Sequence, residues 1–288
     1  MSPQELRQLL ESEGLRPLSA RGQNFLMDQS VVDRMIAVAG LQAGSRVLEI
    51  GPGPGILTEA LLEAGAQVVA VEIDPRFGGL LRHRFGDNPN FKLVQQDVLD
   101  IGNRELCHLV SGGSDDWQVV ANLPYSITSA TIERFVLGQP RPKSLTLMLQ
   151  KEVVDRLLGR PKKTSALTMA VQMVADLEQV CRVPRDSFWP APKVDSAVIH
   201  IKPWSPEKRR EFLRGVSEDF LEKVVRTGFS NRRRQLKNSL SHLHLSPEQV
   251  KKCLEKAEIP AQARPEELVP EQWVRLAEKI LQLEDKSG

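Results

Sequence analysis

The chain has 288 residues, of which 41% are hydrophobic and 26% are charged, a composition typical of a soluble globular protein with about two domains. Its net charge of +2 does not by itself indicate a nucleic-acid-binding protein. The apolar runs are short, so we expect no membrane span, and the charged N-terminus indicates no export signal. The three cysteines are scattered and form no CxxC motif, so we expect no metal site and free thiols in the cytoplasm.

Strand and helix patterns alternate over the first 200 residues. We expect a first helix from the capping-box-like Ser30-Val31-Val32-Asp33 to about residue 39. Strands are expected over residues 45–50, 67–71, 91–95, 117–121, 144–149, 177–183 and 194–202. Helical patterns are expected over about residues 57–64, 75–85, 126–137, from 151, and 165–175. This alternation predicts an α/β fold with a mostly parallel, doubly wound sheet, in which the last two strands pair antiparallel at one edge.

A domain boundary is expected at Pro203-Trp204-Ser205-Pro206, because only helical patterns follow it. Residues 1–204 are the expected α/β domain, and residues 205–288 are an expected all-helical domain with helices beginning near Ser246 and Pro270. From Ser205 onward the chain contains 17 Lys and Arg residues against 14 Asp and Glu residues. Basic clusters suit phosphate contacts, although a solvated helix face remains the alternative. The clustered residues are Arg156, Arg160, Lys162, Lys163, Arg226, Arg232, Arg233, Arg234 and Lys237.

A glycine-rich loop, Gly51-Pro52-Gly53-Pro54-Gly55, follows the first expected strand and precedes a helix. Ligands bind where parallel strands end, and glycines let the backbone approach them closely. A dinucleotide site requires G-x-G-x-x-G, but Ile56 occupies the place of its third glycine. The pattern E-x-G-x-G-x-G instead resembles the S-adenosylmethionine loop of class I methyltransferases.

Two carboxylates end the next two expected strands. Glu72, followed by Ile73, is placed to accept both hydroxyls of a ribose. Asp97, followed by Val98, is placed to accept an N–H of an adenine amine. Each acid alone is more typical of a solvated strand end, but three signals on successive strands favour a methyltransferase over a dehydrogenase.

The segment Asn122-Leu123-Pro124-Tyr125 follows the fourth expected strand and contains the only tyrosine of the chain. A tyrosine ring stacks on a base, while the Asn122 side-chain oxygen and the Leu123 carbonyl each accept one N–H of an exocyclic amine. Pro124 stiffens the turn. Because Asn and Pro are also common turn residues, the segment alone leaves an ordinary turn open.

Further segments extend these motifs into a family resemblance. They are Arg21-Gly22-Gln23-Asn24-Phe25-Leu26, Phe188-Trp189-Pro190-Ala191-Pro192-Lys193-Val194-Asp195-Ser196-Ala197-Val198, residues 232–240 and residues 264–268. Together with the motifs above, they closely resemble the rRNA adenine N6-dimethyltransferase family from about Leu18 through the tail. The resemblance implies a class I S-adenosylmethionine-dependent methyltransferase fold, Rossmann-like with seven strands, and a helical rRNA-binding domain.

The resemblance also implies a role for each matching residue. The implied cofactor-binding residues are Gln23, Asn24, Leu26, Gly51, Gly53, Glu72, Ile73, Asp97, Val98 and Asn122. The implied catalytic residues are Asn122, Leu123, Pro124, Tyr125 and Phe188. Tyr125 and Phe188 would form the two faces of a sandwich around an adenine that has left its stack.

The implied activity is dimethylation of two adjacent adenines in the 3′-terminal hairpin of 16S rRNA, by a cytoplasmic monomer acting on the assembling 30S subunit without a membrane partner. Two departures from the family pattern are Ser126, where Asn is usual, and Thr164-Ser165, where Tyr-Gly is usual. The alternatives are a 23S rRNA adenine methyltransferase of the macrolide-resistance type and a non-catalytic ribosome-assembly factor. A protein glutamine methyltransferase would carry Asn-Pro-Pro-Tyr, which Leu123 disfavours.

Overall fold

The computed structural model describes residues 3–18, 23–159, 164–231 and 234–284. The chain divides into two compact units, residues 1–154 with 177–203 and residues 155–176 with 204–288. The expected boundary near residue 204 is one crossing between the units, but residues 155–176, expected in the α/β domain, group with the helical unit. The reason is hydrophobic: Met169 and Met173 are buried in a cluster whose other buried members all follow residue 204.

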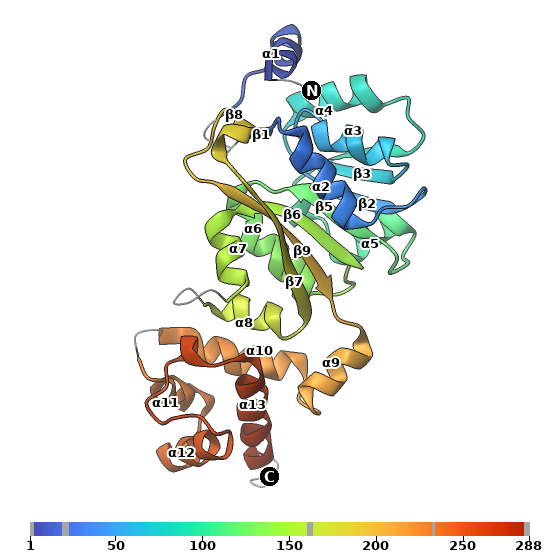
Figure 1. The fold of residues 1–288 in the computed structure, drawn as a ribbon. Helices are drawn as coiled ribbons and strands as arrows, with labels where there is room; N and C mark the ends of the chain where they lie inside the picture. The colour runs from blue at the N-terminus through green and yellow to red at the C-terminus, as the bar shows by residue number, and fades with distance from the viewer. Residues whose placement is uncertain (1–2, 19–22, 160–163, 232–233, 285–288) are drawn as a thin grey trace. The chain divides into compact units, whose positions relative to one another are not determined.

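The first unit is built on a seven-stranded sheet with the order β4-β3-β2-β5-β6-β9-β7 (Figure 1). Its strands are β2 (Arg46–Ile50), β3 (Gln67–Glu72), β4 (Phe91–Gln95), β5 (Gln118–Asn122), β6 (Ser144–Gln150), β7 (Ala175–Val183) and β9 (Ser196–Pro203). Parallel pairs join β4, β3, β2, β5 and β6, whereas β9 is antiparallel to β6. The N–H of Trp204, just after β9, donates to the carbonyl of Val174, just before β7, as in an antiparallel pair. The predicted fold class and the pairing of the last two strands are confirmed.

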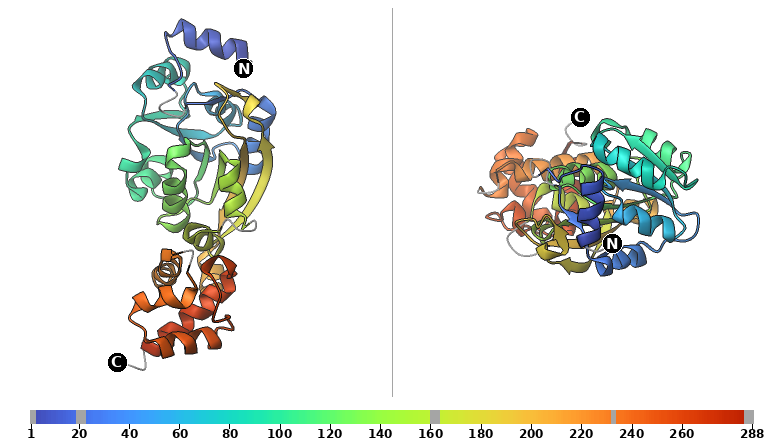
Figure 2. Two further views of the ribbon diagram at one scale, coloured as in Figure 1. Left: turned by 90° about the vertical axis from the view of Figure 1, so that its left-hand side faces the viewer. Right: turned by 90° about the horizontal axis from the view of Figure 1, so that it is seen from above.

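Helices cover both faces of this sheet (Figure 2). They are α2 (Gln29–Ala39), α3 (Ile56–Glu63), α4 (Pro75–Phe85), α5 (Asn103–Ser111), α6 (Thr128–Ile132) and α7 (Lys151–Leu157). Apolar side chains of α2, α3 and α4 form one cluster with Val47 and Val68 of the sheet. Since side chains alternate along a strand, Leu48 points to the opposite face, and α5 packs against β2 and β3. The glycine-rich loop thus leaves the middle of the sheet, beside the reversal of strand order between β2 and β5.

Two expected helices differ from the structure. Helix α2 is capped by Asp28, whose carboxylate accepts the N–H of Ser30 at 3.1 Å, so the expectation that Ser30 caps it was wrong. An aspartate satisfies the same free N–H groups as a serine, and the sequence offers both. The helix expected over residues 126–137 is a 3-10 turn η3 (Tyr125–Ile127), then α6, then a π-helical turn η4 (Glu133–Leu137).

Several short elements were not expected from the sequence. They are α1 (Pro3–Ser12), α5, the 3-10 turns η2 (Val98–Asp100) and η5 (Arg185–Ser187), and the two-stranded sheet of β1 (Phe25–Leu26) and β8 (Phe188–Trp189). The two strands contain only two residues each, which is too short for a periodicity signal. They pair across more than 160 positions of sequence, so only the fold brings them together.

Apart from Ala175 and Asp176 at the start of β7, the regular elements of the second unit among the described residues are helices. They are α8 (Ala166–Gln172), α9 (Pro206–Leu213), α10 (Glu218–Gly228), η6 (Phe229–Asn231), α11 (Leu236–Leu240), η7 (Ser241–Leu243), α12 (Pro247–Lys256), η8 (Pro265–Glu267) and α13 (Pro270–Glu284). Fully buried Trp273 stacks on Phe229 with ring centroids 5.7 Å apart. Ser246 caps α12 in a complete capping box, and α13 begins at Pro270, so both expected helix starts are confirmed.

Part of the basic tail lies within the described residues. Arg234 and Lys237 are exposed, and Arg226 pairs with Glu222 at 2.6 Å. Arg156, also expected in a basic cluster, lies in α7. The remaining expected basic residues and part of the N-terminal motif lie outside the described residues: Arg160, Lys162, Lys163, Arg232, Arg233, Arg21 and Gly22. Across the described ranges, no helix is both long and apolar enough to cross a membrane, and no group of His, Cys, Asp or Glu side chains is arranged to hold a metal ion.

Candidate active site

A cavity of about 480 Å³ opens at the carboxyl ends of β2, β3 and β5. This volume falls within the roughly 300–1,000 Å³ that is common for small-ligand sites. Every candidate site residue expected from the sequence lies on its wall: Gln23, Asn24, Leu26, Gly51, Gly53, Glu72, Ile73, Asp97, Val98, Asn122, Leu123, Pro124, Tyr125 and Phe188. Residues far apart in the chain thus share one cavity.

The glycine loop forms the floor of the cavity with a left-handed backbone. The φ angles of Gly51 and Gly53 are +64° and +54°. A Cβ atom at Gly53 would stand 2.9 Å from the ring of Phe25, and one at Gly51 would touch the ring of Pro124. The positive φ favours glycine at both positions, and at Gly53 a side chain would also crowd Phe25. A ligand can approach a backbone of this kind closely.

Glu72 sits at the end of β3 with only 5% of its surface exposed. Its two carboxylate oxygens accept the backbone N–H groups of Gly53 at 3.1 Å and Asp74 at 2.8 Å. Burial raises the pKa of Glu72, and these two hydrogen bonds oppose the rise. The bonds fix the carboxylate against the glycine loop, so its orientation is set before any ligand arrives.

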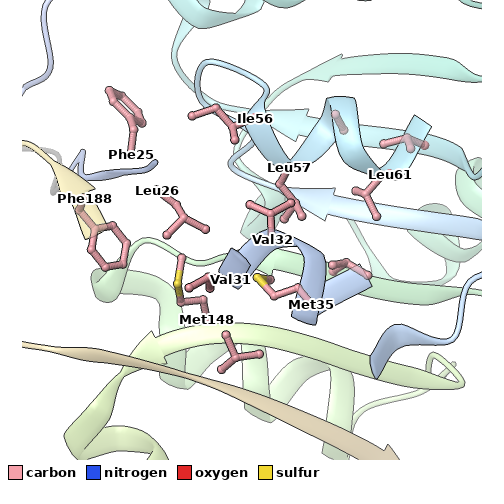
Figure 3. Close-up of a cluster of buried hydrophobic side chains, with 14 of the residues drawn as sticks. Phe25, Leu26, Val31, Val32, Met35, Ile56, Leu57, Leu61, Met148 and Phe188 are labelled. Atoms are coloured by element: carbon pink, nitrogen blue, oxygen red, sulfur yellow. The ribbon is translucent and has the colours of Figure 1, made fainter. Parts of the chain in front are cut away.

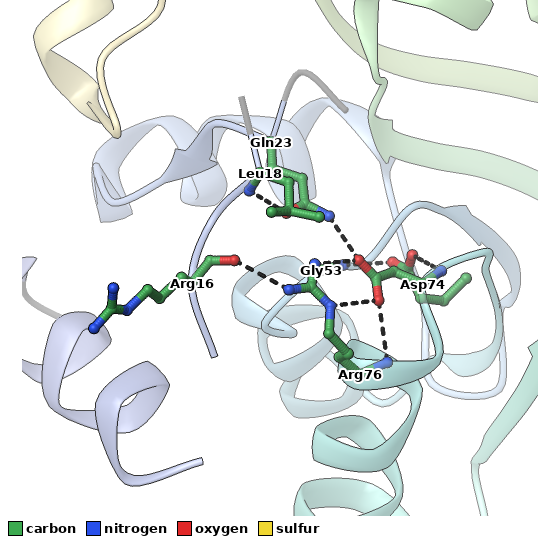
Figure 4. A network of polar contacts seen from close by, with 7 residues as sticks. Arg16, Leu18, Gln23, Gly53, Asp74 and Arg76 are labelled. Atoms are coloured by element: carbon green, nitrogen blue, oxygen red, sulfur yellow. Dashed lines mark hydrogen bonds and ion pairs between the residues drawn. The ribbon is translucent and has the colours of Figure 1, made fainter. Parts of the chain in front are cut away.

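Gln23, expected in a lid over the cofactor, belongs to a polar network below the N-terminal segment (Figure 4). Its side chain accepts the N–H of Leu18 at 2.8 Å and donates to Asp74 at 3.0 Å. Arg76 donates to both oxygens of the same Asp74 carboxylate, and its hydrogen bonds hold the pKa of Asp74 well below the usual range. Sequence reasoning assigned no site role to Asp74, which ties the lid segment to the start of α4.

Asp97 and Val98 form the turn that follows β4. The Asp97 carboxylate accepts the N–H of Leu99 at 2.9 Å and caps η2. Arg134, in the π-helical turn η4, donates to the carbonyl of Val98 and to the side chain of Asn103. The guanidinium is partly buried, which lowers its pKa, while the nearby charge of Asp97 opposes that effect. Arg134 therefore supports this turn from behind, a role that no sequence motif indicated.

The acceptor motif lies across the cavity from these carboxylates. The Asn122 amide nitrogen donates to the Asn24 carbonyl at 3.5 Å, an orientation in which the amide oxygen is left to accept an N–H from a ligand. The Tyr125 hydroxyl lies 3.1 Å from the hydroxyl of buried Ser196. Phe188 is only 3% exposed and lies beside Leu26, its partner in the β1–β8 sheet (Figure 3). An aromatic ring, a fixed amide and a second aromatic ring therefore border the same space.

Glu49 is the site residue that sequence reasoning missed, although it is the acid of the E-x-G-x-G-x-G pattern. It lines the cavity yet is only 1% exposed. Thr58 donates to one carboxylate oxygen at 2.6 Å, and the other oxygen has no hydrogen-bond partner among the described residues. Burial, reinforced by the charge of Glu72, raises the pKa of Glu49 to about 8.

The donor set fits S-adenosylmethionine. Glu72 and Asp97 supply acceptors for hydroxyl and amino groups, and Ile73 and Val98 supply apolar surface on the same side of the cavity. The backbone of the glycine loop carries no side chain at Gly51 and Gly53, and one carboxyl oxygen of buried Glu49 has no hydrogen-bond partner among the described residues, so it is open to a donor group of the ligand. With the strand order of the sheet, these features define a class I S-adenosylmethionine-dependent methyltransferase. The methyl donor is S-adenosylmethionine.

The chain belongs to the ribosomal RNA adenine dimethylase family, whose model matches residues 19–282. Among its relatives, the ribosomal RNA small subunit methyltransferase A of Thermosynechococcus vestitus is 40% identical over 271 residues, covering 91% of this chain and 96% of that protein. The protein of the same name from Picosynechococcus sp. is 36% identical over 92% of this chain and 98% of its own length. The resemblance expected from the sequence is confirmed.

Solved structures agree with this assignment. A dimethyladenosine transferase from Plasmodium falciparum matches with a TM-score of 0.73 and 26% identity, covering 91% of this chain and 98% of that one. The 23S rRNA methyltransferase ErmE matches with a TM-score of 0.67 and 29% identity, covering 90% of this chain and all of that one. Both matches extend through the sheet and the helical unit, so the two-part architecture is shared with rRNA methyltransferases.

Proposed function

We propose that the protein dimethylates the N6 amines of two adjacent adenines in the 3′-terminal hairpin of 16S rRNA, using S-adenosylmethionine. The observation that carries the proposal is the placement of Asn122 and Tyr125 on the same cavity as Glu72 and Asp97. Relatives that match nearly the whole chain carry the name of a small-subunit rRNA methyltransferase. The chain would act in the cytoplasm, as a monomer, on the assembling 30S subunit.

The bound cofactor supplies an electrophilic methyl group. The protein's own contribution is to hold the acceptor amine, whose lone pair is delocalised into the ring. Acceptance of its two N–H groups by the Asn122 side chain and the Leu123 carbonyl favours a more tetrahedral nitrogen. No strong base is required, because the amine proton becomes acidic once the methyl group has arrived. The motif therefore contributes to catalysis by aligning the amine nitrogen with the methyl group and by accepting the N–H groups of the amine.

The two aromatic side chains hold the base. An adenine must leave its stack to reach the cavity, at a cost of a few kcal/mol. Stacking of the adenine on one aromatic ring stabilises the bound base by on the order of 1–3 kcal/mol. The hydroxyl of Tyr125 is held by Ser196, and Phe188 is buried against the β1–β8 sheet, so both rings are fixed at the cavity before the base enters. This arrangement favours adenines in loops or weak pairs.

The helical unit and the basic loops are the proposed grip on the rRNA backbone. Exposed Arg234 and Lys237 lie in a segment free of acidic residues from 226 to 237. Cationic patches of this kind bind phosphates without reading sequence. The unit therefore contributes affinity for the particle, and the cavity selects the base.

A second candidate function is methylation of a 23S rRNA adenine, favoured by the 29% identity to ErmE. The small-subunit relatives are more similar, at 36% and 40% identity. A non-catalytic assembly factor would have no use for the aligned Glu72, Asp97 and Asn122. The first alternative predicts methylation of 23S rRNA, and the second predicts no methyl transfer at all.

The test is incubation of the protein and labelled S-adenosylmethionine with undermethylated 30S subunits or with 50S subunits. We expect label on 30S rRNA only. The variant Asn122→Ala should lose transfer while its binding to 30S subunits survives, and Asn90→Ala, on an exposed loop, is the matched control with full activity. Label on 50S rRNA, or on neither particle, would refute the proposal.

A further inference from the structure

The two-stranded sheet β1–β8 joins the cofactor side of the cavity to the acceptor side. In β1, Leu26 follows the candidate cofactor residues Gln23 and Asn24, and in β8, Phe188 is the candidate base-stacking ring. Leu26 pairs with Phe188 in the register of the two strands. The backbone N–H of Met27 extends the pairing by donating to the Ser187 carbonyl at 2.8 Å. A displacement of one strand is therefore transmitted to the other.

Asp28 lies at the end of this sheet and bonds on two sides. One carboxylate oxygen accepts the backbone N–H of Ser30 at 3.1 Å and its hydroxyl at 2.6 Å, capping α2. The other oxygen accepts the hydroxyl of Ser187 at 3.1 Å, one residue before Phe188. These hydrogen bonds, led by the one from the Ser30 side chain, lower the pKa of Asp28, so the carboxylate is charged at neutral pH.

Helix α2 is a fixed support for this carboxylate. Its side chains Val31, Val32 and Met35 are buried in the main hydrophobic cluster of the first unit (Figure 3). A helix buried in this way moves little, because a packed core resists displacement. The bond from Ser187 therefore anchors the backbone just before Phe188 to the core, and does so at the start of the strand that carries the ring.

We propose that Asp28 is a positioning residue that holds Phe188 through Ser187 and couples cofactor occupancy, sensed at β1, to the placement of the acceptor-side ring. This inference rests on the proposed function for the role of Phe188. When Gln23, Asn24 and Leu26 contact the cofactor, β1 is restrained, and β8 and its ring are restrained with it. Cofactor binding thereby fixes the position of the Phe188 ring before the adenine enters the cavity.

The matched variants are Ser187→Ala and Ser30→Ala. Each removes one hydroxyl that donates to Asp28, the first on the β8 side and the second on the α2 side. Ser30→Ala keeps the backbone N–H that caps the helix. Ser187→Thr keeps a hydroxyl and is the rescue variant. A role limited to general stability would make both alanine variants behave alike.

The first measurement needs no RNA. The full chain is labelled with 5-fluorotryptophan, and the signal of Trp189, next to Phe188, is followed by fluorine NMR as S-adenosylhomocysteine is added. We expect the wild-type signal to shift with cofactor, Ser30→Ala and Ser187→Thr to retain that shift, and Ser187→Ala to lose most of it. Fully buried Trp117 and Trp273 serve as internal references. An unchanged shift in Ser187→Ala, or no shift in the wild type, would overturn the proposal.

The second measurement is steady-state methylation of undermethylated 30S subunits. Loss of one hydrogen bond to a charged group predicts a decrease in kcat/KM of about fivefold or more in Ser187→Ala, with wild-type values in Ser30→Ala. Equal values in the two alanine variants would overturn the coupling while leaving the rRNA activity intact. A wild-type enzyme that methylates no 30S rRNA would instead refute the proposed function.

Discussion

The buried carboxyl of Glu49 predicts a specific dependence of stability on pH, tested by the substitution Glu49→Gln. The pKa of this group is raised from 4.5 to about 8, chiefly by burial. The folded protein therefore binds the proton more tightly than the unfolded chain. The stabilisation that comes from protonated Glu49 is fully present below pH 4.5 and is lost as the pH rises through about 8.

The magnitude follows from the size of the pKa shift. One pKa unit corresponds to about 1.4 kcal/mol, so the free energy of unfolding should fall by on the order of 4 kcal/mol between pH 4.5 and pH 8 through this group alone. Glutamine keeps the shape of the protonated carboxyl and still accepts the hydroxyl of Thr58, but it does not titrate. The variant should therefore gain stability relative to the wild type as the pH rises.

Because the chain has two units, the assay must report on the first one. Urea titrations read by hydrogen exchange of peptides covering β2 and α3 give the local free energy of unfolding for both proteins at pH 5, 6, 7 and 8. The difference between Glu49→Gln and wild type removes the contributions of the titrating groups that do not interact with Glu49. Stability profiles that run parallel over this range would show that Glu49 is not held protonated in the folded protein.

Three further predictions concern single contacts. Arg134→Met should weaken S-adenosylhomocysteine binding about tenfold, measured by calorimetry, because the Val98 carbonyl loses its charged hydrogen-bond donor. An unchanged affinity would show that Arg134 does not support cofactor binding. Gly53→Ala should lower both the cofactor affinity and the melting temperature, since the φ of Gly53 is +54° and a Cβ would stand 2.9 Å from Phe25. Wild-type values in both assays would show that position 53 does not require glycine. Gly228→Ala should lower the melting temperature of the helical unit, because a Cβ would stand 2.4 Å from the indole of α13, while cofactor affinity stays at the wild-type value.

Sequence patterns predicted the fold class and the cavity residues because their signals are local. Glu72 ends β3 and Asp97 lies two residues after the end of β4, and the carboxyl ends of parallel strands meet at one edge of a sheet. Once the order of strands follows from the family resemblance, those positions must converge. The glycine loop and the acceptor motif converge on the same edge for the same reason.

The contacts that the sequence did not predict are those made between distant segments. Asp28 and Ser187 are 159 positions apart, and neither residue belongs to a motif that names its partner. Glu49 was visible as part of a pattern, but its burial and its bond from Thr58 depend on the packing of α3 over β2. The grouping of residues 155–176 with the helical unit likewise follows from where Met169 and Met173 are buried, which a helical pattern alone does not reveal.

The proposed function requires that two methyl groups reach each of two neighbouring adenines of small-subunit rRNA in this cavity. The most direct measurement is mass-spectrometric mapping of rRNA fragments after the protein and S-adenosylmethionine react with ribosomal subunits that lack the modification. We expect N6,N6-dimethyladenosine at two adjacent positions in the 3′-terminal hairpin of 16S rRNA, and its absence with Asn122→Ala. Dimethyladenosine in 23S rRNA, or 16S rRNA that remains unmodified, would contradict it.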